Sequence, residues 1–263
     1  MDYNLIKYPR TPHLEGSRLQ EGDEDLSQIP FSEILGKNIV IEEKIDGANT
    51  AISFDGEGNL LIQSRGHYLY GGYKERHYNL LKQWANINSE LLYSVLGSRY
   101  IMYGEWMYAK HTVFYDALPD YFMEFDIYDR EKKVFLSTER RRQITEKIGI
   151  ISSVPVLGAG IFKSKESVLS LLGDSNYITE NHIEVLRRLA ERQGLDVDRQ
   201  VRETDPSTTM EGLYIKIEEN GTVVDRVKFV RASFLQCVNE STSHWQQRPI
   251  IPNQLVDKYG EDQ

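Results

Sequence analysis

The sequence contains little cysteine, no long apolar run and no internal repeat. Cys237 is the single cysteine among 263 residues, which excludes an internal disulfide and a zinc site built from several cysteines. The six histidines show no metal-ligand spacing, and the first residues lack the apolar core of a signal peptide. No window approaches the length of a membrane span. We therefore expect a cytoplasmic protein without a membrane partner.

Positive charge is scarce, because 31 lysines and arginines face 40 aspartates and glutamates and the net charge is −9. Long-range repulsion would slow an encounter with a polyanion, but an enzyme that handles one strand end needs only a local basic groove. Three clusters are candidates: Arg140 to Arg142, then Arg187, Arg188 and Arg192, then Arg226, Lys228 and Arg231. For the first two, a solvated helix surface is the favoured interpretation.

Alternating apolar residues in the first half of the sequence predict an antiparallel sheet. Strand patterns lie within residues 38–64, at 100–107 and at 121–128. An amphipathic helix is expected over 78–96, ended by Gly97, with Trp84 in the core. Because the strands do not alternate regularly with helices, the pattern favours the α+β class, in which helices flank antiparallel sheets.

The second half of the sequence predicts more helix before a final hairpin. Helical patterns occur at 138–147, 164–172 and 179–193, and the stretch 194–209 is polar and rich in turn-forming residues. We expect one domain over 1–263, with a helical excursion at about 164–209 and a short C-terminal tail at 232–263.

The hairpin at 211–230 permits a geometric prediction. A two-residue Asn-Gly loop would pair the strands so that Lys216 and Lys228 lie on opposite faces. A three-residue loop at 219–221 would put both lysines and Arg226 on one face. If both lysines serve one site, the three-residue form is required, and we predict it.

Lys44 interrupts a strand pattern in IVIEEKIDGANTAISF, residues 39–54. A lysine amine has a reference pKa of about 10.4, so its deprotonation near neutral pH costs about 4.6 kcal/mol unless the site lowers that pKa. Glu42 and Glu43 would raise it, so a nucleophilic Lys44 needs dominant cations nearby. Taken alone, the motif fits a solvated lysine before an Asp-Gly turn better than it fits a nucleophile.

Lys44 is followed by further motifs in a fixed order. They are SRG at 64–66, YGEW at 103–106, FMEFDIYD at 122–129, EGLYIK at 211–216 and RVKFVR at 226–231. Over about residues 38–231 the chain resembles the covalent nucleotidyltransferase superfamily of ATP-dependent polynucleotide ligases and mRNA capping enzymes, most closely RNA ligases of the RNA-ligase-2 type. The resemblance implies an antiparallel-sheet nucleotidyltransferase (ligase adenylylation) fold.

The resemblance also implies a role for each motif. Lys44 would be adenylylated, Asn49 would supply an amide to later steps, and both count as catalytic together with Lys216 and Lys228. The implied contacts with the nucleotide come from Glu42, Glu43, Arg65 (phosphate), Glu105 (ribose), Phe125 (adenine), Lys216 (α-phosphate), Arg226 and Lys228. The implied metal ligands are Asp46, Asp126 and Glu211.

The last motif departs from the family pattern. The family usually shows Lys-x-Lys, whereas this chain has Arg226-Val227-Lys228 and then Arg231. Strand parity puts Arg226 on the face of Lys228 and Arg231 on the other, so Lys228 and Arg226 are assigned to the site; which position replaces the missing lysine stays open. Lys216 and Lys228 would neutralise the α-phosphate and lower the pKa of Lys44 by repulsion.

The implied reaction is ATP-dependent RNA joining, as in RNA repair. Lys44 would attack the α-phosphate of ATP, AMP would pass to a 5′-phosphate, and a 3′-hydroxyl would displace AMP, with Mg²⁺ or Mn²⁺ assisting. RNA ends would be the substrates, and a polynucleotide kinase/phosphatase is a candidate partner. The alternatives are a nick-sealing ATP-dependent DNA ligase and a non-catalytic nucleic-acid-binding module on the same fold.

The two flanking segments leave alternatives open. Because 32 residues follow Arg231, we expect no OB-fold domain, which disfavours DNA ligases and capping enzymes. The segment 8–26 either covers the nucleotide pocket, touches the 5′-phosphate or packs as an ordinary loop. The tail at 243–255 resembles tails of ligases that work beside a kinase, but a surface-wrapping segment with Trp245 buried is favoured.

Overall fold

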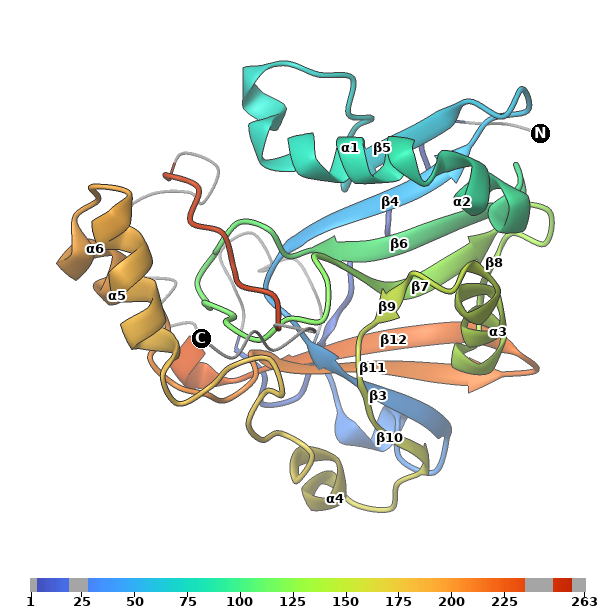
Figure 1. Cartoon of the computed structure of the whole chain (residues 1–263). Coiled ribbons are helices and arrows are strands. Elements are labelled where there is room, and N and C mark those ends of the chain that lie inside the picture. The colour runs from blue at the N-terminus through green and yellow to red at the C-terminus, as the bar shows by residue number, and fades with distance from the viewer. Residues whose placement is uncertain (1–3, 19–27, 235–247, 257–263) are drawn as a thin grey trace.

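The protein is built around one large sheet of mainly antiparallel strands (Figure 1). The computed structural model describes residues 4–18, 28–234 and 248–256. The main path of the sheet is β10-β3-β11-β12-β8-β7-β6-β4-β5, so strands that are distant in sequence lie side by side. Its strands are β3 (Asn38–Lys44), β4 (Ala48–Phe54), β5 (Leu60–Ser64), β6 (Tyr100–Trp106), β7 (Phe122–Asp129), β8 (Val134–Leu136), β10 (Val156–Ile161), β11 (Gly212–Glu219) and β12 (Thr222–Val230), with β1 (His13–Leu14), β2 (Gln28–Ile29) and β9 (Ser152–Ser153) beside them. The predicted class, α+β with antiparallel sheet and flanking helices, is confirmed.

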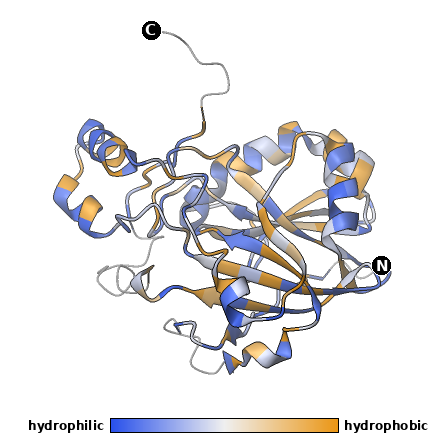
Figure 2. Ribbon diagram, turned by 90° about the horizontal axis from the view of Figure 1, so that it is seen from below, coloured by the Kyte–Doolittle hydropathy of each residue, from blue (hydrophilic) through white to orange (hydrophobic). Residues whose placement is uncertain are grey.

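Helices cover one face of the half of the sheet formed by β4 to β7. They are α1 (Asn79–Ile87), α2 (Ser89–Leu96) and α3 (Thr138–Ile148), and the 3₁₀ helix η2 (Tyr73–Tyr78) precedes α1. The helix predicted over 78–96 is interrupted at Asn88 and ends at Gly97, whose positive φ suits glycine. Trp84 packs against this core and stacks on Phe122, as expected. The helical ribbons show hydrophilic and hydrophobic bands in alternation, as amphipathic packing requires (Figure 2).

A second core lies under the other half of the sheet. Alternate residues of β3 and β11, such as Ile39, Ile41 and Ile215, point into it and meet Val168 of the short helix α4 (Lys165–Leu169). The 3₁₀ helix η1 (Phe31–Glu33) adds Phe31. Residues of opposite parity on β3 and β11 therefore face the opposite side, which is where the polar motif residues lie.

The helices α5 (His182–Arg192) and α6 (Val197–Arg202) lie away from the sheet in Figure 1. α5 falls within a predicted helix, whereas α6 occupies a stretch predicted to be turn-rich, where Asp196 caps its first turn. Residues 248–256, named here the C-terminal strap, run beside the loop 107–118. Trp245, expected to be buried, lies outside the described residues. In the described part of the chain, no helix is long and apolar enough to cross a membrane.

In the final hairpin, Lys216 and Lys228 lie on one face as predicted, but the loop differs from the predicted one. Its loop has two residues, Asn220 and Gly221, both with positive φ, so the predicted three-residue loop is wrong. The register then shifts between Glu218, which pairs with Val223, and Ile217, which pairs with Asp225, leaving Val224 as a β-bulge. The extra residue reverses the parity beyond it. Lys216 consequently pairs with Arg226 and Tyr214 with Lys228, so both lysines share one face.

Candidate active site

The predicted site residues gather where several strands end. Gly212 of β11 pairs with Lys44 at the end of β3, and Asn49 near the start of β4 pairs with Glu105 near the end of β6. Thr50 pairs with Ser64, the residue before the exposed Arg65. The sheet register thus brings the motif residues of β3, β4, β5, β6 and β11 to one edge of the sheet.

Lys44 forms an ion pair with Glu211 at this edge, with 2.7 Å between Nζ and Oε1. The Lys44 side chain is 24% exposed, whereas that of Glu211 is 2% exposed, so the amine is the accessible member of the pair. Burial opposes the charge on Lys44, but Glu211, Glu105 and Asp46 outweigh it and raise the pKa of the amine. The expectation that neighbouring lysines lower this pKa is therefore wrong for the protein by itself.

Two carboxyl groups of the site hold their protons unusually tightly. Burial raises the pKa of Glu105 to about 8, although Lys44 and Arg65 act in the other direction. Burial likewise raises the pKa of Glu211 to about 7, against the effect of Lys44, and its Oε2 atom is buried without a hydrogen-bond partner. Near neutral pH, Glu105 can therefore donate a hydrogen bond, and Glu211 is poised to accept a proton.

Lys216 is completely buried, and its contacts differ from the expectation. Its Nζ lies 2.9 Å from Oε2 of Glu42 and 3.1 Å from Oδ1 of Asp126, and it donates to the carbonyl of Phe125. Arg226 approaches Asp126 at 3.4 Å from the neighbouring strand. Lys216, Arg226, Glu42 and Asp126 thus form an ionic network in the floor of the site, rather than a ring of cations around Lys44.

Arg141 completes this ionic network from α3. It is fully buried, pairs with Glu42 and lies 3.0 Å from Oε2 of Glu124. The interpretation of this arginine as solvated helix surface is therefore wrong, although Arg140 and Arg142 are exposed as expected. Its burial could have been predicted, because Arg141 shares a helical face with Ile144 and Ile148.

Asp46 and Asp126, the other predicted metal ligands, are engaged by protein groups. Although burial opposes it, Lys216 and Arg226 hold the pKa of Asp126 below its ordinary value. Asp46 accepts hydrogen bonds from the backbone N–H groups of Thr112 and Val113 at 2.8 and 2.9 Å. Within the described ranges, no three His, Cys, Asp or Glu side chains are grouped so that they could hold a metal ion. Two of the three carboxylates have a buried oxygen without a hydrogen-bond partner, Oδ1 of Asp126 and Oε2 of Glu211. Oδ1 of Asp126 lies 3.1 Å from the Lys216 ammonium, so Oε2 of Glu211 is the oxygen that a hard cation or its water would satisfy best.

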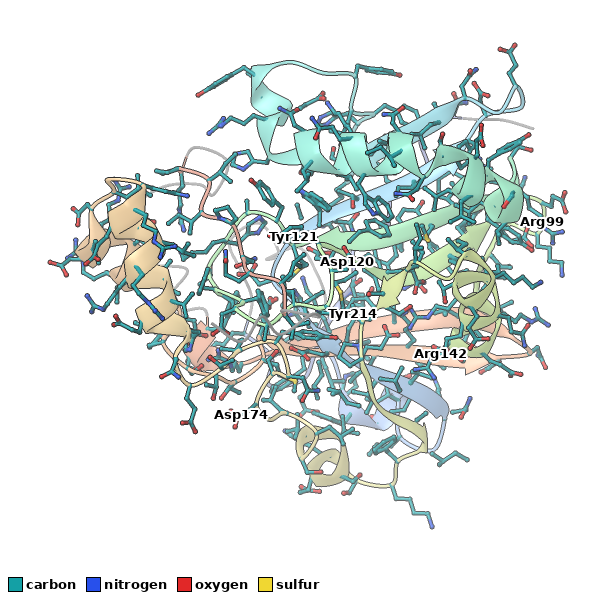
Figure 3. All side chains as sticks on the ribbon, in the orientation of Figure 1. Arg99, Asp120, Tyr121, Arg142, Asp174 and Tyr214 are labelled. Atoms are coloured by element: carbon teal, nitrogen blue, oxygen red, sulfur yellow. The ribbon has the colours of Figure 1, made fainter. Side chains whose placement is uncertain are left out.

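Phe125 and Lys228 line the same face at its margins. Phe125 is the extra residue of a bulge in β7 and is half-buried, with Tyr8 edge-on at 5.1 Å between ring centroids. Lys228 is half-buried and pairs across the hairpin with Tyr214, which lies near the centre of the molecule (Figure 3). Arg231 leaves this face and binds Asp205 and the carbonyl of Met210, which agrees with the parity argument.

Glu43 is the one predicted residue whose side chain the structure separates from the others. It points to the opposite face of β3, is 2% exposed, and both of its carboxylate oxygens lack a hydrogen-bond partner. Burial raises its pKa to about 7. Parity explains the separation, because Glu42 and Lys44 share the face that Glu43 leaves.

The N-terminal segment contributes a residue that the sequence argument missed. The Tyr8 hydroxyl donates to Oδ2 of Asp126 at 2.6 Å and contacts the Tyr214 hydroxyl, so the segment lies over the floor of the site. His13 is buried, and its Nδ1 lies 2.7 Å from the Ser17 hydroxyl. Arg10 and Arg18 are exposed, and the rest of the predicted segment, 19–26, lies outside the described residues.

Comparisons with known proteins agree with this geometry. A family model described as RNA ligase matches residues 37–230. A structure of a Naegleria gruberi RNA ligase mutant with AMP and Mn is similar at 15% identity and a TM-score of 0.53, covering 80% of this chain and 54% of that chain. A second mutant with AMP and Mn is 14% identical, with a TM-score of 0.52 and the same coverage. The chain thus spans about half the length of these structures, and the likeness to them concerns the fold. No curated protein matches the sequence.

Proposed function

Because the chain belongs to the RNA ligase family, we propose that it joins RNA ends with ATP through an AMP adduct on Lys44. One observation carries the proposal: a partly exposed amine stands beside the buried carboxylate of Glu211, at the edge where the motif strands meet. A solvated lysine in an ordinary turn would not have three carboxylates directed at it. The similar Naegleria structures with AMP and Mn support nucleotide and divalent-metal use.

Lys44 would act as the nucleophile of the first step. Its Nζ forms a bond to the α-phosphorus of ATP while the bond to the pyrophosphate oxygen breaks. The proton of the amine has a nearby acceptor, since Oε1 of Glu211 lies 2.7 Å away and its pKa is about 7. AMP then passes to an RNA 5′-phosphate, and an RNA 3′-hydroxyl displaces it.

Glu211 is the protein group that best fits a divalent cation, because its buried Oε2 has no other partner. Mg²⁺ commonly binds through one or two carboxylates together with substrate phosphates and waters. When bound, the ion would neutralise carboxylate charge beside Lys44 and screen the triphosphate. Asp46 and Asp126 are already engaged by protein groups, Asp46 by two backbone N–H groups and Asp126 by Tyr8 and Lys216.

The remaining site residues would bind and orient the nucleotide. A protonated Glu105 suits a ribose hydroxyl, and the half-buried ring of Phe125 suits adenine. Lys228 would approach the phosphates from the margin of the site. Lys216 is held by Glu42 and Asp126, so it would act mainly by raising the local positive potential. We also propose the RNA-ligase-2 subtype and a role in RNA repair, both from the motif pattern. A kinase/phosphatase partner is proposed from the resemblance of the tail at 243–255, and a cytoplasmic location from the single cysteine and the first residues of the sequence.

A nucleotide panel with a gel readout tests the proposal. The full chain is incubated with ATP or GTP and Mg²⁺ or Mn²⁺, and the adduct is then offered RNA with a 5′-phosphate and a 3′-hydroxyl. We expect an AMP adduct and joined RNA, with no adduct for Lys44→Arg. Equal sealing of DNA 3′-hydroxyl ends would favour the DNA ligase alternative. Binding of RNA ends without any adduct would favour a non-catalytic module.

A further inference from the structure

A basic and aromatic loop follows Arg65 and has no role in the mechanism above. We name residues 65–76 the tyrosine loop. In this loop, Tyr70 is 86% exposed and Tyr73 is 79% exposed. Tyr70 is the most exposed large hydrophobic side chain in the described part of the chain. Burial of an aromatic ring is strongly favourable, so two neighbouring rings that are exposed to solvent indicate a binding surface.

The tyrosine loop is attached to the active-site edge at both ends. It begins directly after Ser64, which pairs with Thr50. Just after its other end, the carbonyl of His77 accepts a 2.8 Å hydrogen bond from the indole of Trp106, the neighbour of Glu105. Arg65 lies close enough to Glu105 to influence its pKa. Both ends of the loop therefore lie at the active-site edge.

The side chains of the loop match a single-stranded nucleic acid better than a protein. Arg65 precedes the tyrosines and Lys74 and Arg76 follow them, and the guanidinium of Arg76 lies 4.7 Å from the centre of the Tyr73 ring. Glu75, the one carboxylate of the loop, is ion-paired with Lys82. This local positive charge stands out in a chain of net charge −9, and aromatic rings flanked by cations are the usual surface for stacked bases.

The backbone of the loop presents the two rings separately. Gly71 and Gly72 lie between the tyrosines, and both have positive φ, which side-chain-bearing residues rarely adopt. The Gly71 N–H donates to Oε2 of Glu75 at 2.7 Å, which holds the turn. The Tyr68 ring lies 6.2 Å from that of Tyr70 and supports it from the strand side.

We infer that the tyrosine loop binds the single-stranded end of an RNA substrate by stacking bases on Tyr70 and Tyr73. The inference rests on the proposed function for the identity of the strand. Stacking is sequence-tolerant, because every base has a π-face, so the loop would hold RNA ends without selecting their sequence.

Fluorescence anisotropy with a labelled single-stranded RNA tests the inference on the full chain. Tyr70→Ala and Tyr73→Ala are each expected to weaken binding about tenfold, and the double variant more. Tyr70→Phe and Tyr73→Phe keep the ring and should bind like the wild type. Ile87→Ala is the matched control, because Ile87 is 83% exposed at the end of α1. Formation of the AMP adduct from ATP alone should be unchanged in all of these variants.

Wild-type RNA affinity in the double Tyr→Ala variant would overturn the inference. If the same variant binds RNA normally but no longer self-associates in sedimentation experiments, the rings form a protein contact and the inference is also overturned. Failure of the proposed function is a separate result, namely no AMP adduct in the wild-type protein. The binding comparison does not depend on that adduct, so the two failures can be told apart.

Discussion

Asn253 of the C-terminal strap should stabilise the turn that follows Lys44. Its side chain is fully buried, and its Oδ1 accepts from the Tyr115 N–H at 3.0 Å while its Nδ2 donates to the Met107 carbonyl at 2.6 Å. The Tyr115 hydroxyl in turn accepts from the N–H of Asp46, two residues after Lys44. The strap thereby reaches the turn that follows Lys44 through one tyrosine.

The expected cost of Asn253→Ala follows from these contacts. The substitution leaves two buried backbone groups, the Tyr115 N–H and the Met107 carbonyl, without partners. Each such group costs about 1–3 kcal/mol, so the free energy of unfolding should fall by about 2–6 kcal/mol. This is a large share of the roughly 5–15 kcal/mol that stabilises a typical domain. Asn253→Asp keeps the acceptor for Tyr115 but loses the donor to Met107, so it should also destabilise the fold.

Urea unfolding followed by tryptophan fluorescence measures this effect. Gln254→Ala is the matched control, because its half-buried amide bonds only to the Pro252 carbonyl within the strap. We expect that control to lie within about 0.5 kcal/mol of the wild type. An Asn253→Ala protein as stable as the Gln254→Ala control would refute the reasoning that the strap holds the loop 107–118.

The remaining predictions concern charged groups. Arg141→Ala should lower the free energy of unfolding by about 3–5 kcal/mol in urea titrations, because it leaves Glu124 buried without its closest cation and Glu42 with Lys216 alone. Arg140→Ala at the exposed neighbouring position should have little effect. Glu211→Gln should lower the pKa of Lys44, so acylation of this amine, mapped by mass spectrometry, should begin at a lower pH than in the wild type. An unchanged dependence of acylation on pH would contradict the ion pair. The folded state holds the Glu43 proton more tightly than the unfolded chain does, so the contribution of Glu43 to stability should fall by about 3 kcal/mol as pH rises from about 4.5 to about 7. Glu211 and Glu105 add to the same slope, so Glu43→Gln should make this part of a stability-versus-pH curve shallower without removing the slope.

The fold was largely predictable because its determinants are local. Alternating residues in β3, β4 and β11 specify element type and buried face before any tertiary contact is considered. The spacing of Leu80, Trp84, Ile87, Leu91 and Val95 likewise predicts a helix, but Leu80, Ile87 and Leu91 are exposed. The buried face carries Leu81, Ala85 and Leu92 instead, so the helix was predictable and its buried face was not. Two further predictions were wrong, the three-residue loop of the final hairpin and the turn-rich stretch that contains α6. The bulge at Val224 inserts one residue into an otherwise regular strand, and no feature of the sequence distinguishes it from a longer loop.

The grouping of the predicted site residues at one edge was predictable, but their charge pairing was not. Motif order identified Lys44, Glu105 and Glu211, and the strand register brings them to one edge. The partners of Lys216 come from Glu42 and Asp126 on other strands, and such pairing depends on tertiary packing. For the same reason, the sequence did not reveal the contacts of Tyr8 or those of the strap, although a surface-wrapping segment was predicted at 243–255.

The most direct test of the account is to locate the AMP after the first step. The full chain is incubated with ATP and a divalent cation, digested, and analysed by mass spectrometry for an AMP-bearing peptide. The account predicts a single modified residue, Lys44, and loss of the modification in Lys44→Ala. AMP on another residue, or equal modification of the Lys44→Ala protein, would contradict it.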